Sequence, residues 1–185
     1  MKPRTSHYAT TTPRRLGSLI GAVFGLVYLL ANAGPLPSGA AISLRGLAGI
    51  AFIAVLWAIA RSASGPEPTD ARGFGPGYWP IVAVEVVALA VGLSLINGPL
   101  DVPRAAVAWV SFVVGAHFLA LAVAFDERLF RWIGGAIGAC GLAGLALAAA
   151  GSGAAAIAAV SGLIPGAVLL ASAWWGTRPG SSQHR

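Results

Sequence analysis

Long apolar segments, separated by short polar or Gly/Pro-rich stretches, occupy most of the chain. Each segment is about 20 residues long, and at 1.5 Å per residue a helix of that length crosses the roughly 30 Å hydrocarbon core of a bilayer. The pattern predicts six spans, near residues 16–33, 41–60, 79–97, 105–124, 130–150 and 154–175. We therefore expect an all-α polytopic membrane protein with one transmembrane domain over 16–175, a basic tail over 1–15 and a second tail over 176–185.

The connections between the predicted spans alternate in character. Short turns with Gly, Pro, Asn or Ser lie at 34–37, 97–99 and 151–153. The segment 61–78 is longer and reads as a flexible loop. Because short turns join antiparallel neighbours, we expect three helical hairpins. Similar residues precede the three turns, from Leu30, Leu95 and Leu147, and either triplication or chance convergence on good turn residues explains this similarity.

Basic residues are distributed unequally between the two sides of the predicted spans. With the N-terminus placed inside, ten of the twelve Lys and Arg residues fall on the inner side, and only Arg45 and Arg104 fall on the outer side. Cytoplasmic flanks of membrane proteins carry the excess of Lys and Arg. Both termini and the 61–78 loop are therefore predicted to be cytoplasmic.

The composition excludes a soluble fold. The chain is 57% hydrophobic and 10% charged, whereas an ordinary soluble domain is about 25% charged. The net charge is +6, but the charged residues lie beside the predicted spans, which argues against a nucleic-acid partner. A chain of 185 residues with six spans also leaves no room for a separate catalytic domain. Ala and Gly dominate the spans and Lys2 is the only lysine, a bias typical of GC-rich bacterial genomes. We expect a multi-pass protein of the bacterial cytoplasmic (inner) membrane, with the lipid bilayer as its partner.

Cofactor and enzyme signatures are weak. Cys140 is the only cysteine, so the chain offers no intrachain disulfide and no cysteine-based metal site. Ser94 and Ser111 are the only hydroxyls near the polar groups described below, and no Ser/His/acid set is evident. We predict no cofactor and no metal, and we favour a protein that is not an enzyme.

Small residues in the predicted spans favour close helix packing. They recur at three- and four-residue spacings that let helix backbones approach one another. The expected product is a compact bundle or a homo-oligomer formed through these faces. Pro165 should kink the sixth span, and such a kink would serve either packing or gating. The small residues concerned are Gly17, Gly21 and Gly25 in the first span, and Gly134, Gly135, Gly138, Gly141 and Gly144 in the fifth.

Two ionisable residues interrupt the apolar spans. Glu85 lies within the third span and His117 within the fourth, whereas the other acidic residues lie in loops or at span ends. An ionisable group inside the membrane is costly and marks a functional site by default. The two residues are equally distant from the turn 97–104, so antiparallel helices place them at the same depth. We expect Gly92 and Gly115 to let these two helices approach closely.

Three roles remain open for Glu85 and His117. They could form a polar latch that merely satisfies both side chains, or they could exchange a proton along a transport pathway. A metal site is least favoured, because one His and one Glu supply too few ligands from a monomer. The sequence therefore indicates an integral inner-membrane protein of unknown activity with an intramembrane Glu/His pair. The alternatives are a small proton-coupled carrier or channel subunit, and a membrane-embedded interaction or stress-response protein.

Two resemblances accompany this interpretation. The segment Phe74-x3-Tyr78-Trp79-x-Ile81-Val82-x2-Glu85, followed by Val114-Gly115-x-His117-Phe118-x2-Leu121-Ala122, resembles small bacterial six-span integral membrane proteins to which no activity is assigned. The hairpin repeat is also loosely similar to the short-repeat membrane family associated with acid resistance. The first resemblance implies a six-span fold without a mechanism. The second would imply a role in stress response, but that family does not lead us to expect the Glu/His pair.

Overall fold

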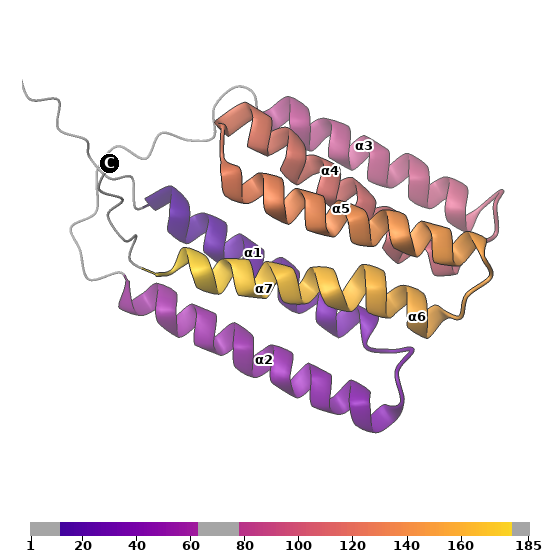
Figure 1. Cartoon of the computed structure of the whole chain (residues 1–185), viewed down its shortest axis with the longest axis horizontal. Helices are drawn as coiled ribbons and strands as arrows, with labels where there is room; N and C mark the ends of the chain where they lie inside the picture. Colours follow the sequence, from indigo (N-terminus) through magenta and orange to yellow (C-terminus); the bar gives the residue numbers. More distant parts are fainter. Residues whose placement is uncertain (1–11, 63–77, 179–185) are drawn as a thin grey trace, which may run out of the picture.

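The structure is a computed structural model, and it describes residues 12–62 and 78–178, with side chains from residue 16 onward. These residues form helices and turns (Figure 1). Most of the predicted tails and of the predicted flexible loop at 61–78 lies outside the described residues, but α1 already begins at Thr12, inside the first predicted tail, and α7 ends at Gly176, inside the second. The helices are α1 (Thr12–Asn32), α2 (Ser38–Arg61), α3 (Tyr78–Asn97), the 3₁₀ turn η1 (Pro103–Ala105), α4 (Ala106–Phe125), α5 (Arg128–Ala149), α6 (Ala154–Ala158), the π-helical turn η2 (Ala159–Leu163) and α7 (Ile164–Gly176).

The lengths and apolar character of the helices are those of a multi-pass membrane protein. Five helical segments are long and apolar enough to cross a bilayer, and α1 carries a shorter apolar segment, Leu16–Asn32. Large apolar side chains cover the outside of the bundle, with Val123 85% exposed and Val84 70% exposed. Such surfaces are stable when they face lipid instead of water. The five long apolar segments are Ser38–Arg61, Tyr78–Asn97, Pro103–Phe125, Arg128–Ala149 and Ala154–Gly176.

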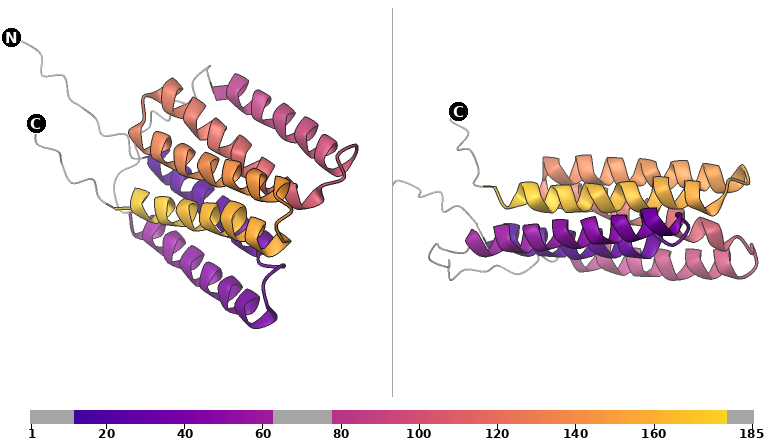
Figure 2. Two further views of the ribbon diagram at one scale, coloured as in Figure 1. Left: turned by 45° about the vertical axis from the view of Figure 1, so that its right-hand side comes forward. Right: turned by 90° about the horizontal axis from the view of Figure 1, so that it is seen from below.

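The helices lie roughly side by side, with α3 at one edge of the bundle and α2 at the other (Figures 1 and 2). Consecutive helices α1 and α2 are in contact, as are α3 and α4. The most extensive packing, however, joins α4 to α5 and α1 to α7, which are helices from different predicted hairpins. The grouping into three hairpins therefore stays a prediction. Helix α3 packs mainly on α4 and is the helix least enclosed by others on its side of the bundle.

Glycines allow close backbone contacts between two pairs of helices. A Cβ atom at Gly115 of α4 would lie 2.3 Å from the backbone nitrogen of Gly138 in α5, and one at Gly25 of α1 would lie 2.9 Å from the backbone oxygen of Gly166 in α7. Only residues without a side chain permit such approaches. The faces used here are occupied by helices of the same chain. Gly17 and Gly135, which belong to the same predicted set, meet nothing within 4 Å and lie outside these contacts.

Gly115 corrects one expectation. We expected it to bring α4 close to α3, but it faces Gly134 and Gly138 of α5 instead. The rotation of α4 about its own axis determines which neighbouring helix Gly115 contacts. Because α4 is apolar on all sides, its sequence does not indicate which of its faces meets α3 and which meets α5. Gly92, in contrast, does lie at the contact between α3 and α4.

The sixth predicted span is interrupted near Pro165, where helix α6 passes through the π-helical turn η2 into α7. Proline has no backbone N–H, so the carbonyl of Ser161, four residues earlier, cannot receive the usual helical hydrogen bond from residue 165. Both Pro165 and Ser161 are fully buried. A buried carbonyl that lacks this bond needs another partner inside the protein, because water does not reach it.

Candidate functional site

Glu85 of α3 and His117 of α4 lie against each other in the structure. Oε2 of Glu85 is 3.0 Å from Nδ1 of His117, and the two side chains are 19% and 13% exposed, respectively. The antiparallel course of α3 and α4 brings the two residues to one level, and the rotations of both helices turn the side chains together. The sequence could supply the common level but not the facing orientation.

The contact has the distance of an ion pair without the alignment of a good hydrogen bond. Nδ1 of His117 is buried, and it has no well-aligned hydrogen-bond partner among the described residues, although the carboxylate oxygen is 3.0 Å away. The edge of the Phe118 ring packs against the imidazole, with 5.9 Å between ring centroids. The position of one proton decides the state of the pair. With the proton on His117 the pair is ionic, and with the proton on Glu85 it is neutral.

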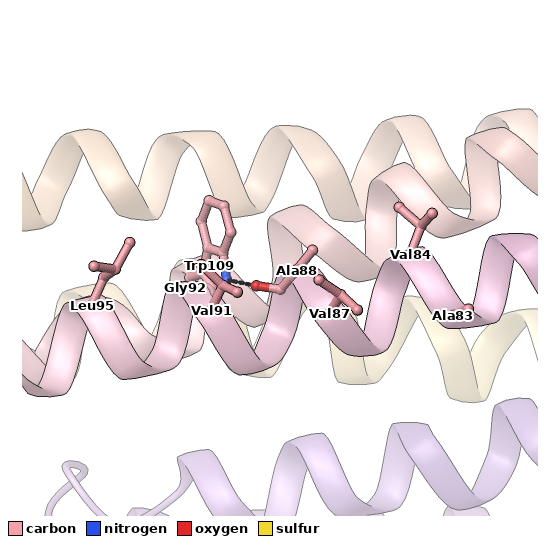
Figure 3. A pocket seen from close by; sticks show the side chains of 8 residues that line it. All are labelled: Ala83, Val84, Val87, Ala88, Val91, Gly92, Leu95 and Trp109. Atoms are coloured by element: carbon pink, nitrogen blue, oxygen red, sulfur yellow. Dashed lines mark hydrogen bonds between the residues drawn. The ribbon is translucent and has the colours of Figure 1, made fainter.

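A second polar contact joins the same two helices. Nε1 of Trp109 in α4 donates a hydrogen bond to the backbone oxygen of Ala88 in α3, at 3.1 Å (Figure 3). Gly92 makes room for the indole, because a Cβ atom at this position would lie 2.0 Å from Nε1 of Trp109. The sequence alone did not single out Trp109. Tryptophans in membrane proteins usually lie near the membrane interfaces. The position of Trp109 away from the interfacial aromatic residues is the feature of the sequence that could have pointed to it.

The outer side of this contact is a shallow apolar groove of about 560 Å³ along α3. Its lining has no ionisable side chain, and the only polar side-chain atom in it is the indole nitrogen that bonds Ala88. Val87 is 61% exposed and Val91 53% exposed on this face. The groove therefore suits hydrocarbon and offers no chemistry. It is lined by Ala83, Val84, Val87, Ala88, Val91, Gly92, Leu95 and Trp109 (Figure 3).

A second polar cluster lies inside the bundle, where α1, α4, α5 and η2 meet. The hydroxyl of Ser111 donates a hydrogen bond to the backbone oxygen of Ser161, the carbonyl that cannot receive the usual helical bond from residue 165. Oη of Tyr28 lies 3.4 Å from Oγ of Ser111. Since the single hydroxyl hydrogen of Ser111 goes to the carbonyl, the phenol of Tyr28 is the donor in this second contact. The hydroxyl of Ser161 in turn donates to the backbone oxygen of Cys140, at 3.0 Å.

This cluster fastens helices together. Its hydrogen bonds end on the carbonyl oxygens of Ser161 and Cys140, which accept but cannot donate. From the sequence, Ser111 stood out only as a possible nucleophile, and Tyr28 and Ser161 did not stand out at all. No motif marks them, because their partners come from distant helices.

The remaining candidates do not form a site. Among the described residues, no three His, Cys, Asp or Glu side chains gather closely enough to hold a metal ion. Cys140 is half-buried, and its backbone oxygen, not its thiol, takes part in the polar cluster. Ser94 is exposed near the far end of α3, about two and a half helical turns from Glu85. No protein-family model matches the chain, and no curated protein or solved structure shows significant similarity to it.

Proposed function

We propose that this chain is an integral protein of the bacterial inner membrane in which the Glu85–His117 pair is a polar latch that fastens α3 to the rest of the bundle. The 3.0 Å approach of Oε2 of Glu85 to Nδ1 of His117 carries this proposal. Helix α3 packs mainly on α4, so its attachment depends on the contacts between these two helices. The latch and the Trp109–Ala88 hydrogen bond are the two polar contacts between them that we identify.

Polar contacts matter here because the apolar surface of α3 gains little from helix packing. Lipid tails are as apolar as valine side chains, so burial against another helix supplies little hydrophobic driving force. Close packing at Gly92 and interhelical polar contacts remain as the means of holding α3. Each polar partner also reduces the cost of placing the other in the membrane. A single interhelical contact of this kind contributes about 0.6 kcal/mol on average and about 1.7 kcal/mol at most.

The orientation belongs to the same proposal. We place both termini in the cytoplasm, and the distribution of arginines in the fold supports this. Arg61, Arg128, Arg131 and Arg178 lie where α2 ends, α5 begins and α7 ends, which is one end of the bundle in Figure 1. Arg45 lies near the start of α2 and Arg104 in η1, toward the opposite end. The inner leaflet is assigned to the arginine-rich end.

The second candidate function is a small proton-coupled carrier or channel subunit. The observation that favours it is the partial exposure of the pair, 19% for Glu85 and 13% for His117, which leaves both groups within reach of an exchanging molecule. In such a protein the proton would move from the carboxyl oxygen of Glu85 to Nδ1 of His117, leaving a carboxylate and an imidazolium.

Two substitutions at Glu85 separate these functions. Glu85→Gln keeps the shape and the hydrogen-bonding ability of the side chain but cannot titrate, whereas Glu85→Leu leaves His117 unpaired. Each variant would be unfolded with sodium dodecyl sulfate in mixed micelles, and proton flux would be measured in proteoliposomes with an enclosed pH-sensitive dye. Val84→Leu, on the lipid-exposed side of the same helix, is the matched control.

The latch predicts that Glu85→Leu lowers the free energy of unfolding by about 1–2 kcal/mol, while Glu85→Gln changes it by less than about 0.5 kcal/mol. It also predicts the same proton flux for both variants and the wild type. Unchanged stability of Glu85→Leu would contradict the latch. A folded Glu85→Gln protein that loses a proton flux present in the wild type would replace the latch with the carrier.

A further inference from the structure

Tryptophan and arginine gather at one end of the bundle. Five of the six tryptophans lie there, at the end of α2, the start of α3, the start of α5 and the end of α7, and Trp109 alone lies toward the other end. Trp57, Trp79, Trp132 and Trp175 are each more than half exposed. Exposed tryptophans favour the headgroup level of a bilayer, so this end marks a membrane interface.

The arginines at this interface are of two kinds. Arg61 lies over the ring of Trp57 at 4.3 Å, and Arg178 lies over the ring of Trp175 at 4.8 Å, so these guanidinium groups are stacked on neighbouring indoles. No such stacking involves Arg128 or Arg131 among the described residues. Both side chains instead line a shallow hollow of about 520 Å³ on α5, together with Trp132, Gly135 and Ala136.

The hollow lies on one face of α5. Its five residues stand at positions i, i+3, i+4, i+7 and i+8 counted from Arg128, which is one side of a helix. The opposite side of α5, with Gly134, Gly138 and Gly141, packs on α4. The face with the hollow therefore points away from the bundle toward the surroundings. A Cβ atom added at Gly135 would meet nothing within 4 Å, which shows that the floor of the hollow is open.

The chemistry of this face changes along the helix. Arg128 and Arg131 lie in the first turn of α5, where guanidinium groups and an indole N–H can bind a phosphate group. Gly135 is seven residues farther along than Arg128, about 10 Å deeper in the span, where the surroundings are hydrocarbon. A molecule that fits the whole face carries an anionic headgroup and an acyl chain. Free phosphate would use only the arginine end.

Acidic neighbours reduce the positive charge but leave donors available. Nη2 of Arg131 pairs with Oδ1 of Asp126 at 2.8 Å, and the side chains of this pair are 57% and 93% exposed. An ion pair so exposed is weak and is easily exchanged for another anion. Guanidinium has five N–H donors, of which this contact uses one. Glu127 is also exposed, and Arg128 has no ion-pair partner among the described residues.

We infer that this face of α5 binds an anionic phospholipid of the phosphatidylglycerol type, with its phosphate at Arg128 and Arg131, its glycerol backbone beside Trp132 and the start of an acyl chain over Gly135 and Ala136. Basic residues at the cytoplasmic side of transmembrane helices are known to attract anionic headgroups. This site is separate from the Glu85–His117 pair and does not depend on the function proposed for that pair.

Lipid binding to the full-length protein in detergent can be measured by native mass spectrometry. Palmitoyl-oleoyl phosphatidylglycerol would be titrated against phosphatidylcholine with the same chains, and sn-glycerol 1-phosphate would serve as the headgroup without acyl chains. The variant Arg128→Gln/Arg131→Gln removes both guanidinium groups. The matched control is Arg45→Gln/Arg104→Gln, which removes the same charge toward the other end of the bundle. Circular dichroism would establish that each variant retains its helical content.

The wild type should bind phosphatidylglycerol more tightly than phosphatidylcholine. Each arginine near a membrane surface is worth about a fivefold change in affinity, so the double variant should bind phosphatidylglycerol about 25-fold more weakly and phosphatidylcholine unchanged. If the double variant does not fold, Arg128→Gln alone should weaken phosphatidylglycerol binding about fivefold. Equal wild-type affinity for the two lipids would overturn the inference, as would an equal loss in the control variant. Competition by sn-glycerol 1-phosphate at the concentration of the lipid would assign the site to free phosphate instead.

Discussion

The buried hydrogen bond from Ser111 to the carbonyl of Ser161 leads to a quantitative prediction. Pro165 removes the backbone N–H that would otherwise bond this carbonyl, and the hydroxyl of Ser111 takes its place from a different helix. Both serines are 0% exposed, so water cannot replace the hydroxyl when it is removed. Ser111→Ala should therefore leave the carbonyl of Ser161 without a partner.

The cost of this substitution follows from two opposing effects. A buried polar group without a partner costs about 1–3 kcal/mol in soluble proteins. Interhelical hydrogen bonds in a membrane protein contribute less, with a maximum near 1.7 kcal/mol, because the unfolded chain in the membrane also finds partners. The burial and the missing amide at Pro165 place this bond near the upper limit. We expect Ser111→Ala to lower the free energy of unfolding by about 1–2 kcal/mol.

A double-mutant cycle with Pro165→Ala isolates the cause. Alanine at position 165 supplies an N–H that can bond the carbonyl of Ser161 in the ordinary helical manner, so Ser111 should matter less in that background. Ser111→Ala also removes the hydrogen-bond acceptor of the Tyr28 phenol, but it does so in both backgrounds, and this effect cancels in the cycle. The coupling free energy between the two substitutions should be about 1 kcal/mol.

Reversible unfolding with sodium dodecyl sulfate, followed by circular dichroism in mixed micelles, would provide the four free energies. The expected result is a cost of about 1–2 kcal/mol for Ser111→Ala in the wild type and about 0.5 kcal/mol or less in the Pro165→Ala background. Equal costs in the two backgrounds would refute the argument, because they would show that the proline does not determine the role of Ser111.

Further predictions concern packing and orientation. Gly115→Ala should destabilise the protein by about 1–3 kcal/mol, because the new Cβ would lie 2.3 Å from the backbone nitrogen of Gly138. Gly135→Ala meets nothing within 4 Å and should be neutral or stabilising by up to about 1 kcal/mol, so equal losses in the two variants, measured by detergent unfolding, would contradict the assigned contact. Reporter fusions at residue 1, within 61–78, after Asp126 and at the C-terminus should all report the cytoplasm, and a periplasmic signal from 61–78 would reverse the orientation.

Most of the secondary structure follows from hydropathy alone. The predicted spans at 41–60 and 79–97 correspond to helices Ser38–Arg61 and Tyr78–Asn97, with boundaries that differ by no more than three residues. Such agreement has a simple cause, since a chain that crosses hydrocarbon must satisfy its backbone within its own segment and therefore forms a helix over the apolar run. The common depth of Glu85 and His117 follows as easily, because it needs only the length of the turn between two antiparallel helices.

The faces that meet depend on tertiary structure. Glu85 and His117 could have stood at the same depth on opposite sides of their helices, and Gly115 belongs to the contact with α5 although the sequence suggested α3. Tyr28, Ser111 and Ser161 form one cluster from three distant segments, and none of them carries a local mark of its partner. Hydropathy assigns each apolar segment to the membrane but leaves its rotation open when the segment is apolar on every side. Packing between helices far apart in the chain determines that rotation, and with it the set of polar groups that come into contact.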